Sequence, residues 1–522
     1  MSDFRLTYST MFNPPEALHA AFERSLARVR QELGRSHCLY IDGKDVAAPE
    51  TFDKTSPIDT RWLLGRFQKA GTAEVDAAMR AAQRAYPAWR RTPWQERVAL
   101  LRRVAVRIEE RVYDIAAALA LEVGKNRMEA LGEVQEVADF FNLYAADMER
   151  NGGFDLALPD DPLENFRSHN RSVLKPYGVW AVISPYNFPF ALSGGPVAAA
   201  LVTGNTVVLK AASDTPWSVR LLADCLHDAG VPAGVFNFLT GSGAQAGQAL
   251  IDHPLLAGVT FTGSHETGMH ILRSFAAGRY PRPAILEMGG KNAAIVTRHG
   301  DLSRAALGIV RSAFGLTGQK CSALSRVYVE AAVADELLRR IGAEMARLVV
   351  GDPTERPVNL GPVANARAAD GFERYTAQLA ASATVLAGGQ RLRGAALDHG
   401  YFCAPTLAEA PLDHPLFREE MFVPILMVAR VPDKEAAMAA ANGVDLGLTA
   451  GMYGSEAELR WFLDEIEAGV TYCNRPQGAT TGAWPGYQPF GGWKGSGSTG
   501  KGIASAYYLP LYLREQSQTV VE

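Results

Sequence analysis

Five short apolar runs between residues 179 and 288 constrain the fold more than any other feature of this sequence. The runs are WAVIS, TVVLK, VFNFL, GVTFT and AILEM, and a segment about one helix long separates each from the next. Apolar strands joined by helix-length crossovers are typical of a parallel β-sheet covered by helices on both faces. The pattern therefore predicts a doubly wound α/β domain whose ligands bind at the carboxyl ends of the strands.

The flanking segments predict further layers of structure. Between residues 73 and 149, apolar residues recur at spacings of three and four, as from Val98 to Val112, which indicates amphipathic helices. From Asp301 onward strand and helix patterns resume, with the run SRVYVE and an expected helix over 334–348. A second α/β domain is therefore expected, because 522 residues exceed what a single hydrophobic core supports.

Two other segments have a β-like character. The first, Gly152 to Lys175, is rich in Pro, Asp and Asn and is interpreted as a linker or a protruding hairpin. The second, Tyr507 to Glu522, alternates apolar and polar residues, which favours a strand that pairs with another subunit.

Composition and charge exclude several classes of protein. Apolar residues make up 48% of the chain and charged residues 21%, as in folded globular proteins. The formal net charge of −4, with the signs interspersed, provides no basic stripe for a nucleic-acid backbone. We therefore expect small-molecule ligands and no nucleic-acid partner.

The N-terminus and the most apolar stretch favour a cytoplasmic protein. The N-terminal sequence lacks a continuous apolar core and contains Asp3 and Glu16, which argues against a signal or transit peptide. Residues 179–208 are interrupted by Asn187, Asn205 and several Pro and Gly residues, so buried sheet and helix are expected there instead of a membrane span.

The cysteines indicate free thiols in a reducing compartment. They are odd in number, far apart and without a CxxC pair, so neither a disulfide framework nor a metal site is expected. The five are Cys38, Cys225, Cys321, Cys403 and Cys473.

The glycine-rich sequences do not match the common phosphate-binding motifs. Gly241, Gly243 and Gly247 follow an apolar run, but the last spacing is one residue longer than in GxGxxG. Residues 495–501 read GxxxxGK, yet Gly502 replaces the required Ser or Thr and no strand precedes the motif. A turn is the better interpretation of this second sequence.

Cys321 and Glu287 are the candidates for catalysis. Cys321 lies in FGLTGQKCSALSR beside Lys320, and a neighbouring cation would lower the pKa of the thiol and favour a nucleophile. Glu287 ends an apolar run in LEMGGKN, where burial would raise its pKa and suit it to act as a general base. The structural alternatives are a core thiol and a salt-bridged glutamate.

Together these segments resemble the aldehyde dehydrogenase superfamily over roughly residues 39–522. The resemblance implies NAD, with NADP possible, as the cofactor and a homo-oligomer built from dimers. It also implies an N-terminal and NAD(P)-binding domain over 1–151 and 176–286 and a catalytic domain over 287–475. The oligomerisation strands would be 152–175 and 503–522, and 476–502 would form the substrate anchor loop and return segment.

The resemblance also assigns catalytic and cofactor residues. Asn187, in SPYNFPF, would hold the oxyanion together with the backbone N–H of Cys321, and Glu287 would activate water. Two positions depart from the family pattern: Ser213 replaces the glutamate expected near the adenosine ribose, and Val423 replaces a glycine. The cofactor residues implied are Ser184, Pro185, Lys210, Ser213, Gly243, Gly247, Gly263, Ser264, Glu420 and Phe422.

Within the superfamily, GQKCSA and TGAWPGYQPFGGWKGSG resemble the 1-pyrroline-5-carboxylate dehydrogenase branch, which oxidises L-glutamate γ-semialdehyde to L-glutamate. The segment 476–480 is about three residues longer than in that branch, and Trp484 is bulky, so another semialdehyde or a more apolar aldehyde is the alternative. A CoA-acylating enzyme or a non-catalytic homologue is a further alternative, which Glu287 and the retained site residues disfavour. The substrate residues implied are Phe188, Ser322, Gly482, Ala483 and Phe490.

Overall fold

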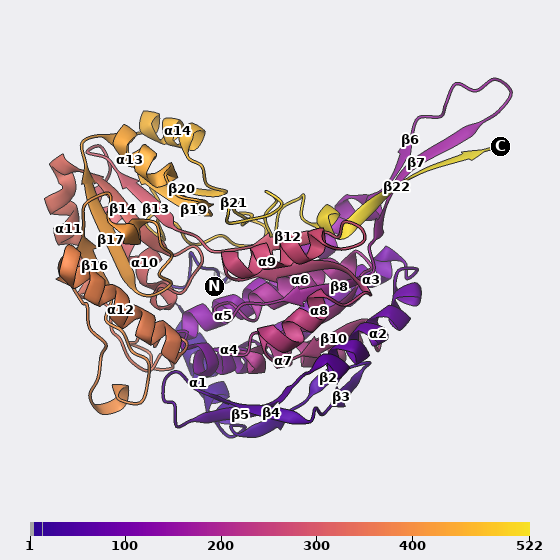
Figure 1. The fold of residues 1–522 in the computed structure, drawn as a ribbon, viewed down its shortest axis with the longest axis horizontal. Helices are drawn as coiled ribbons and strands as arrows, with labels where there is room; N and C mark the ends of the chain where they lie inside the picture. Colours follow the sequence, from indigo (N-terminus) through magenta and orange to yellow (C-terminus); the bar gives the residue numbers. More distant parts are fainter. Residues whose placement is uncertain (1–4, 13) are drawn as a thin grey trace.

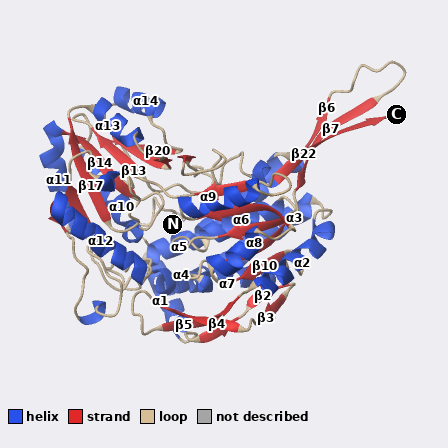
Figure 2. Ribbon diagram, in the orientation of Figure 1, coloured by secondary structure: helices blue, strands red, loops and turns tan. Residues whose placement is uncertain are grey.

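The computed structural model describes residues 5–12 and 14–522. Two α/β bodies, each built around a seven-stranded sheet, lie side by side, and a β arm extends from the first body (Figure 1). Helices and strands alternate along most of the chain (Figure 2). This architecture confirms the predicted fold class, a Rossmann-type doubly wound domain with a second α/β domain and a small β element.

The first sheet has the order β12-β11-β8-β9-β10-β2-β3. The five strands from β12 to β10 run parallel to one another, and β2 pairs with β10 in the antiparallel direction. β9 and β11 flank β8 on opposite sides, so the chain reverses direction across the sheet at β8, the position where ligands bind in such folds. The strands are β8 (Val179–Ile183), β9 (Thr206–Lys210), β10 (Phe236–Leu239), β11 (Leu256–Thr262), β12 (Ala284–Glu287), β2 (Leu39–Ile41) and β3 (Lys44–Val46).

Helices cover this sheet as the sequence predicts. The crossovers are α6 (Ala191–Val202), α7 (Pro216–Asp228), α8 (Gln248–Ile251) and α9 (His265–Ala276). The predicted helical layer consists of α2 (Thr72–Trp89), α3 (Trp94–Glu110), α4 (Val112–Val123) and α5 (Arg127–Arg150), preceded by α1 (Glu16–Arg30).

One sheet near the N-terminus was not predicted. It has the order β1-β5-β4, formed by β1 (Arg35–His37), β5 (Leu63–Lys69) and β4 (Glu50–Thr55). β4 reads ETFDKT and is mostly exposed or half-buried, so it lacks the apolar run that marks a buried strand.

The second body is a mostly parallel sheet of order β15-β16-β17-β14-β13-β19-β20, in which β15 alone runs antiparallel to its neighbour. The helix expected over 334–348 is α11 (Ala331–Met345), which begins three residues earlier. The strands are β13 (Asn292–Val296), β14 (Leu324–Glu330), β15 (Thr384–Ala387), β16 (Thr406–Glu409), β17 (Ile425–Val431), β19 (Thr449–Tyr453) and β20 (Val470–Cys473). The other long helices are α10 (Leu302–Phe314), α12 (Ala366–Ser382), α13 (Lys434–Asn442) and α14 (Glu456–Glu465).

The arm is a three-stranded antiparallel sheet that projects from the first body (Figure 1). It consists of β6 (Asp155–Leu158), β7 (Ser168–Pro176) and β22 (Leu513–Val521), so residues 152–175 form a protruding hairpin and not a linker. The terminal strand begins at Leu513 and not near 507, because residues 509–512 form a 3₁₀-helix. β22 pairs with β7 of the same chain. The predicted domain boundaries stay predictions.

Within residues 5–12 and 14–522, no helix has both the length and the hydropathy needed to cross a membrane. The apolar stretch 179–208 instead forms β8, α6 and β9, as predicted. All five cysteines are free thiols.

Candidate active site

A strained turn presents Cys321 between α10 and β14. Leu316, Thr317 and Gly318 have φ values of 48°, 54° and 71°, which is left-handed backbone that a β-branched residue such as Thr317 rarely adopts. Burial holds the turn: Leu316 packs into the main core, and the Thr317 hydroxyl donates to the carbonyl of Gly361 at 2.9 Å. The turn fixes the chain direction immediately before Cys321, the candidate nucleophile.

The environment of Cys321 corrects one expectation. Lys320 was expected to lower the pKa of the thiol, but its ammonium pairs with Glu129 at 2.8 Å. Burial raises the pKa of Cys321 to about 12, and the charges of Glu420 and Glu287 add to the effect. Cys321 is therefore a neutral thiol at rest, which must lose its proton as it reacts.

Glu287 has the environment expected of a general base. It ends β12 and is only 8% exposed, and burial raises its pKa well above the usual value, although the backbone N–H of Gly492 opposes the shift. Its Oε2 is buried without a hydrogen-bond partner among the described residues. An unpartnered carboxylate oxygen is free to accept a proton from water.

The loop after β8 carries Asn187 and is held from two sides. The Asn187 amide donates to the carbonyl of Gln319 at 2.8 Å, which leaves its second N–H for another acceptor. Glu133 accepts from two backbone N–H groups at the start of α6 and pairs with Lys125 at 2.5 Å. The Lys125 ammonium also lies 3.4 Å from the ring centroid of Phe188.

The predicted cofactor residues of the first body gather where β8, β9, β10 and β11 end. Burial lowers the pKa of Lys210 to about 8, and its ammonium donates only to the neighbouring carbonyl of Ala211, at 3.0 Å, among the hydrogen bonds described. The Ser184 hydroxyl is buried without a partner in the described part of the chain. These polar atoms fit a polar ligand such as a dinucleotide. Ser184 and Pro185 follow β8, Lys210 ends β9, Gly243 and Gly247 follow β10, and Gly263 and Ser264 follow β11.

The two departures from the family pattern have clear structural settings. Ser213 is exposed and donates its hydroxyl to the carbonyl of Gly241 at 3.0 Å. Val423 is buried in the core of the second body, and its neighbour Phe422 carries the left-handed φ, 56°. Because position 423 does not require a left-handed backbone, the valine is accommodated there.

Glu420 connects the second body to the end of β12. Its Oε1 accepts from the backbone N–H of Gly290 at 2.9 Å, and burial raises its pKa to about 7. A side chain at Gly289 would lie 2.0 Å from the other carboxylate oxygen, so only glycine permits this approach.

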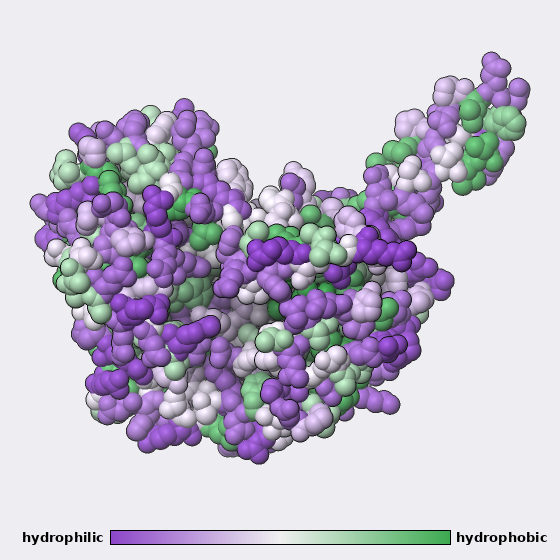
Figure 3. Space-filling model, in the orientation of Figure 1, coloured by the Kyte–Doolittle hydropathy of each residue, from purple (hydrophilic) through white to green (hydrophobic). Residues whose placement is uncertain are grey.

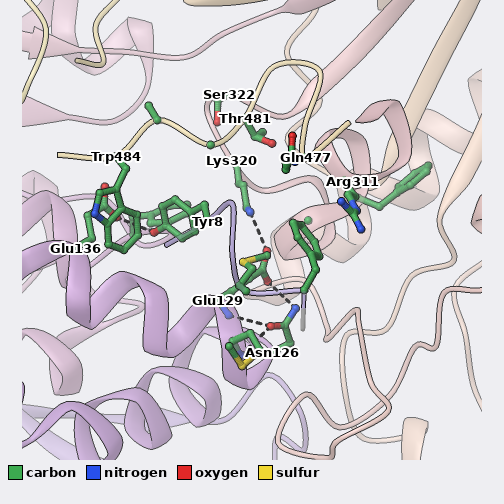
Figure 4. A pocket seen from close by; sticks show the side chains of 18 of the residues that line it. Tyr8, Asn126, Glu129, Glu136, Arg311, Lys320, Ser322, Gln477, Thr481 and Trp484 are labelled. Atoms are coloured by element: carbon green, nitrogen blue, oxygen red, sulfur yellow. Dashed lines mark hydrogen bonds and ion pairs between the residues drawn. The ribbon is translucent and has the colours of Figure 1, made fainter. Parts of the chain in front are cut away.

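A cavity of about 490 Å³ contains Cys321 and all five predicted substrate residues. Figure 4 shows part of its lining, including Ser322 and Thr481. The cavity lies where the two bodies meet, because its lining comes from α5, α10 and the segment after β20. The structure thus brings together Cys321, Phe188, Ser322, Gly482, Ala483 and Phe490.

The anchor loop depends on Arg475, which sequence reasoning did not identify. Gly482 has φ of 118°, and the Arg475 guanidinium donates to the carbonyls of Thr481 and Gly482 at 3.1 and 3.4 Å. The hydroxyl of Thr480 donates to the carbonyl of Ser322 at 2.7 Å, which joins the anchor loop to the nucleophile segment.

Sequence reasoning also missed an acidic face of α5 beside the cavity, two of whose carboxylates, Glu129 and Glu136, line it. Its four carboxylates recur at helical spacing, a signal that was readable in the sequence, but three of their four partners are distant along the chain. The pairs are Glu129 with Lys320, Glu133 with Lys125, Glu136 with Tyr8, whose hydroxyl donates at 2.6 Å, and Asp139 with Trp484, whose indole donates at 2.7 Å.

No cluster of three or more His, Cys, Asp or Glu side chains suited to a metal ion occurs within residues 5–12 and 14–522.

Comparison with known proteins places the chain in a family. The sequence profile of the Aldehyde dehydrogenase family matches residues 44–517. A protein of Geobacillus kaustophilus (strain HTA426) named 1-pyrroline-5-carboxylate dehydrogenase is 37% identical over 516 residues, 97% of each chain. One of the same name from Geobacillus sp. (strain WCH70) is 36% identical over 516 residues, also 97% of each chain.

Solved structures agree with these relatives. A structure of 1-pyrroline-5-carboxylate dehydrogenase from Thermus with bound NAD superposes with a TM-score of 0.92 at 36% identity, covering 100% of this chain and 99% of the other. A lactaldehyde dehydrogenase structure superposes with a TM-score of 0.86 at 31% identity, covering 94% and 100%. The chain therefore belongs to the aldehyde dehydrogenase family.

Proposed function

We propose that this protein oxidises L-glutamate γ-semialdehyde to L-glutamate with NAD(P). The observation that carries the proposal is the cavity that joins Cys321 to Ser322 and to the Gly482–Ala483 turn. The relatives named 1-pyrroline-5-carboxylate dehydrogenase, which match nearly the whole chain, support the same substrate.

The reaction begins at Cys321. Its thiol loses its proton to water as the sulfur attacks the aldehyde carbon, and the second N–H of the Asn187 amide and the Cys321 backbone N–H stabilise the oxyanion that forms. Such a preorganised donor contributes roughly 3 kcal/mol to the transition state. NAD(P)⁺, when bound, accepts the hydride that leaves the thiohemiacetal carbon.

Glu287 completes the reaction by hydrolysis. Its buried carboxylate takes a proton from a water molecule, which attacks the thioester carbonyl and releases the acid and the Cys321 thiol. This glutamate favours water over CoA as the acyl acceptor, because an enzyme that transfers the acyl group to CoA needs no base to activate water.

The cofactor is held between the strand ends of the first body and Glu420 of the second body. Lys210 would bind the adenosine ribose, Gly263 and Ser264 would lie beside the pyrophosphate, and Glu420 would bind the nicotinamide ribose. Ser213 places no negative charge near the adenosine ribose, so NADP is tolerated together with NAD.

The substrate's α-carboxylate is received by the Ser322 hydroxyl and the backbone N–H groups of Gly482 and Ala483, while Phe188 and Phe490 flank the chain. The decisive test compares kcat/KM for glutamate γ-semialdehyde and hexanal, with NAD and with NADP. We expect the semialdehyde to be preferred, by up to roughly 10⁴-fold, because hexanal leaves the polar donors unpaired. Ser322→Ala should reduce this preference; a preference for hexanal that Ser322→Ala does not change would contradict the assignment.

We also propose that the arm mediates assembly of a homo-oligomer built from dimers and that the enzyme is cytoplasmic. Apolar side chains are exposed along the arm, where Figure 3 shows hydrophobic patches. Such exposure favours burial against a second copy of the chain. The exposed residues are Leu156, Leu158, Leu163, Phe166, Val520 and Val521. The five free thiols support a reducing compartment.

A further inference from the structure

The cavity that contains Cys321 extends beyond the residues assigned to glutamate γ-semialdehyde. Figure 4 shows Gln477 and then Arg311 on the far side of Thr481 from Ser322. This outer part is formed by one face of α10 together with the N-terminal segment and the segment after α11. Its apolar lining includes Leu307, Val310, Phe314, Phe12, Leu348 and Val358.

Arg311 is the cation of this outer part that has no carboxylate partner among the described residues. Its guanidinium lies 3.7 Å from the ring centroid of Phe12 and donates to the carbonyl of Pro476 at 3.4 Å, a long hydrogen bond. It is half-buried, so it has lost part of its hydration. A guanidinium held in this way gains more from binding an anion than one that is free in water.

The other three arginines that line the cavity have carboxylate partners. Arg347 pairs with Glu344 at 2.9 Å, Arg356 pairs with Glu16 at 2.8 Å and with Glu23 at 2.6 Å, and Arg127 also pairs with Glu23, at 3.1 Å. One unpaired positive charge therefore remains, which matches a ligand group with a single negative charge.

We propose that Arg311 and Gln477 form an outer carboxylate-binding position for aldehydes whose carboxylate lies further from the aldehyde carbon than in glutamate γ-semialdehyde. The inference rests on the proposed function, because it requires that aldehydes react at Cys321. The guanidinium binds the carboxylate through two parallel N–H···O bonds, and the Gln477 amide can donate another. The apolar face of α10 covers the additional methylene groups.

The test uses two seven-carbon aldehydes that differ only at the far end, pimelate semialdehyde and heptanal. With the full-length enzyme and NAD, Arg311→Met should lower kcat/KM for pimelate semialdehyde roughly ten- to hundredfold, the range expected for a hydrogen-bonded charge. The values for heptanal and for glutamate γ-semialdehyde should stay within about twofold of wild type. Arg311→Lys should retain part of the activity, and Gln477→Ala should cause a smaller, equally selective loss.

Arg347→Met is the matched control, because this arginine lines the same cavity but already has a carboxylate partner. It should leave the ratio of the two seven-carbon substrates unchanged. An equal loss for heptanal in Arg311→Met, or no loss for pimelate semialdehyde, overturns the outer position. Glutamate γ-semialdehyde separates this result from the proposed function: wild-type enzyme that fails to oxidise it contradicts the proposed function alone, since the pimelate to heptanal ratio still reports on Arg311.

Discussion

The buried pair of Lys125 and Glu133 predicts a large and specific loss of stability when the lysine is removed. Both side chains are 0% exposed and lie 2.5 Å apart, and Glu133 also accepts from the two N–H groups that begin α6. Lys125→Met leaves the carboxylate buried without its counter-charge. Breaking a buried pair in this way costs about 3–5 kcal/mol of unfolding free energy. The Phe188 ring also loses the cation 3.4 Å from its centroid.

A double-mutant cycle measured by urea denaturation tests this magnitude. Glu133→Gln keeps an acceptor oxygen for the two N–H groups but removes the charge, so Lys125→Met combined with Glu133→Gln should be more stable than Lys125→Met alone by about 2 kcal/mol or more. Because Phe188 lines the cavity and is proposed to flank the substrate, KM should rise in the single variant. A loss below about 1 kcal/mol in Lys125→Met, or additive effects in the double variant, would refute the reasoning.

Further expectations concern the reaction itself. Cys321→Ala should abolish NADH production while cofactor binding by fluorescence titration persists; substantial turnover would exclude this residue as the nucleophile. Glu287→Gln should retain the pre-steady-state burst of NADH but slow the steady state, whereas a lost burst would contradict its role in hydrolysis. Burial raises the pKa values of Glu287 and Cys321, so the basic forms are populated only as pH rises, and kcat should increase with pH above neutrality; a profile that falls there would be inconsistent with both assignments. Ser213→Glu should reduce kcat/KM with NADP more than with NAD, and an unchanged ratio would show that this position does not face the ribose.

The sequence predicted the buried parts of the fold better than the exposed parts. TVVLK coincides with β9, residues 206–210, because a fully buried parallel strand must be apolar throughout. The small sheet around β4 was not predicted, because ETFDKT is largely exposed and carries no periodic signal. For the arm, the sequence predicted the terminal strand but left 152–175 open as a linker or a hairpin, and the start of β22 depends on a preceding 3₁₀-helix that the alternating pattern does not distinguish.

The parts of the site that could be predicted are those with a local signal in the sequence. The candidate nucleophile and the predicted substrate residues lie in short local motifs, and the structure brings these residues together in one cavity. The protonation state of Cys321 was not predictable from its neighbour Lys320, because the direction of that side chain is decided by Glu129 on α5, far away in the sequence. The left-handed turn at 316–318 was not predictable either, since leucine and threonine, the residues at 316 and 317, rarely adopt a left-handed backbone conformation.

Mass spectrometry of the Glu287→Gln enzyme tests the central claim most directly. This variant, incubated with glutamate γ-semialdehyde and NAD, should accumulate the acyl-enzyme because the base for hydrolysis is missing. We predict a glutamyl thioester on the peptide that contains Cys321, and none when the same enzyme also carries Cys321→Ala. An adduct on Cys38, Cys225, Cys403 or Cys473, or oxidation of the semialdehyde with no covalent adduct at any stage of turnover, would contradict the account.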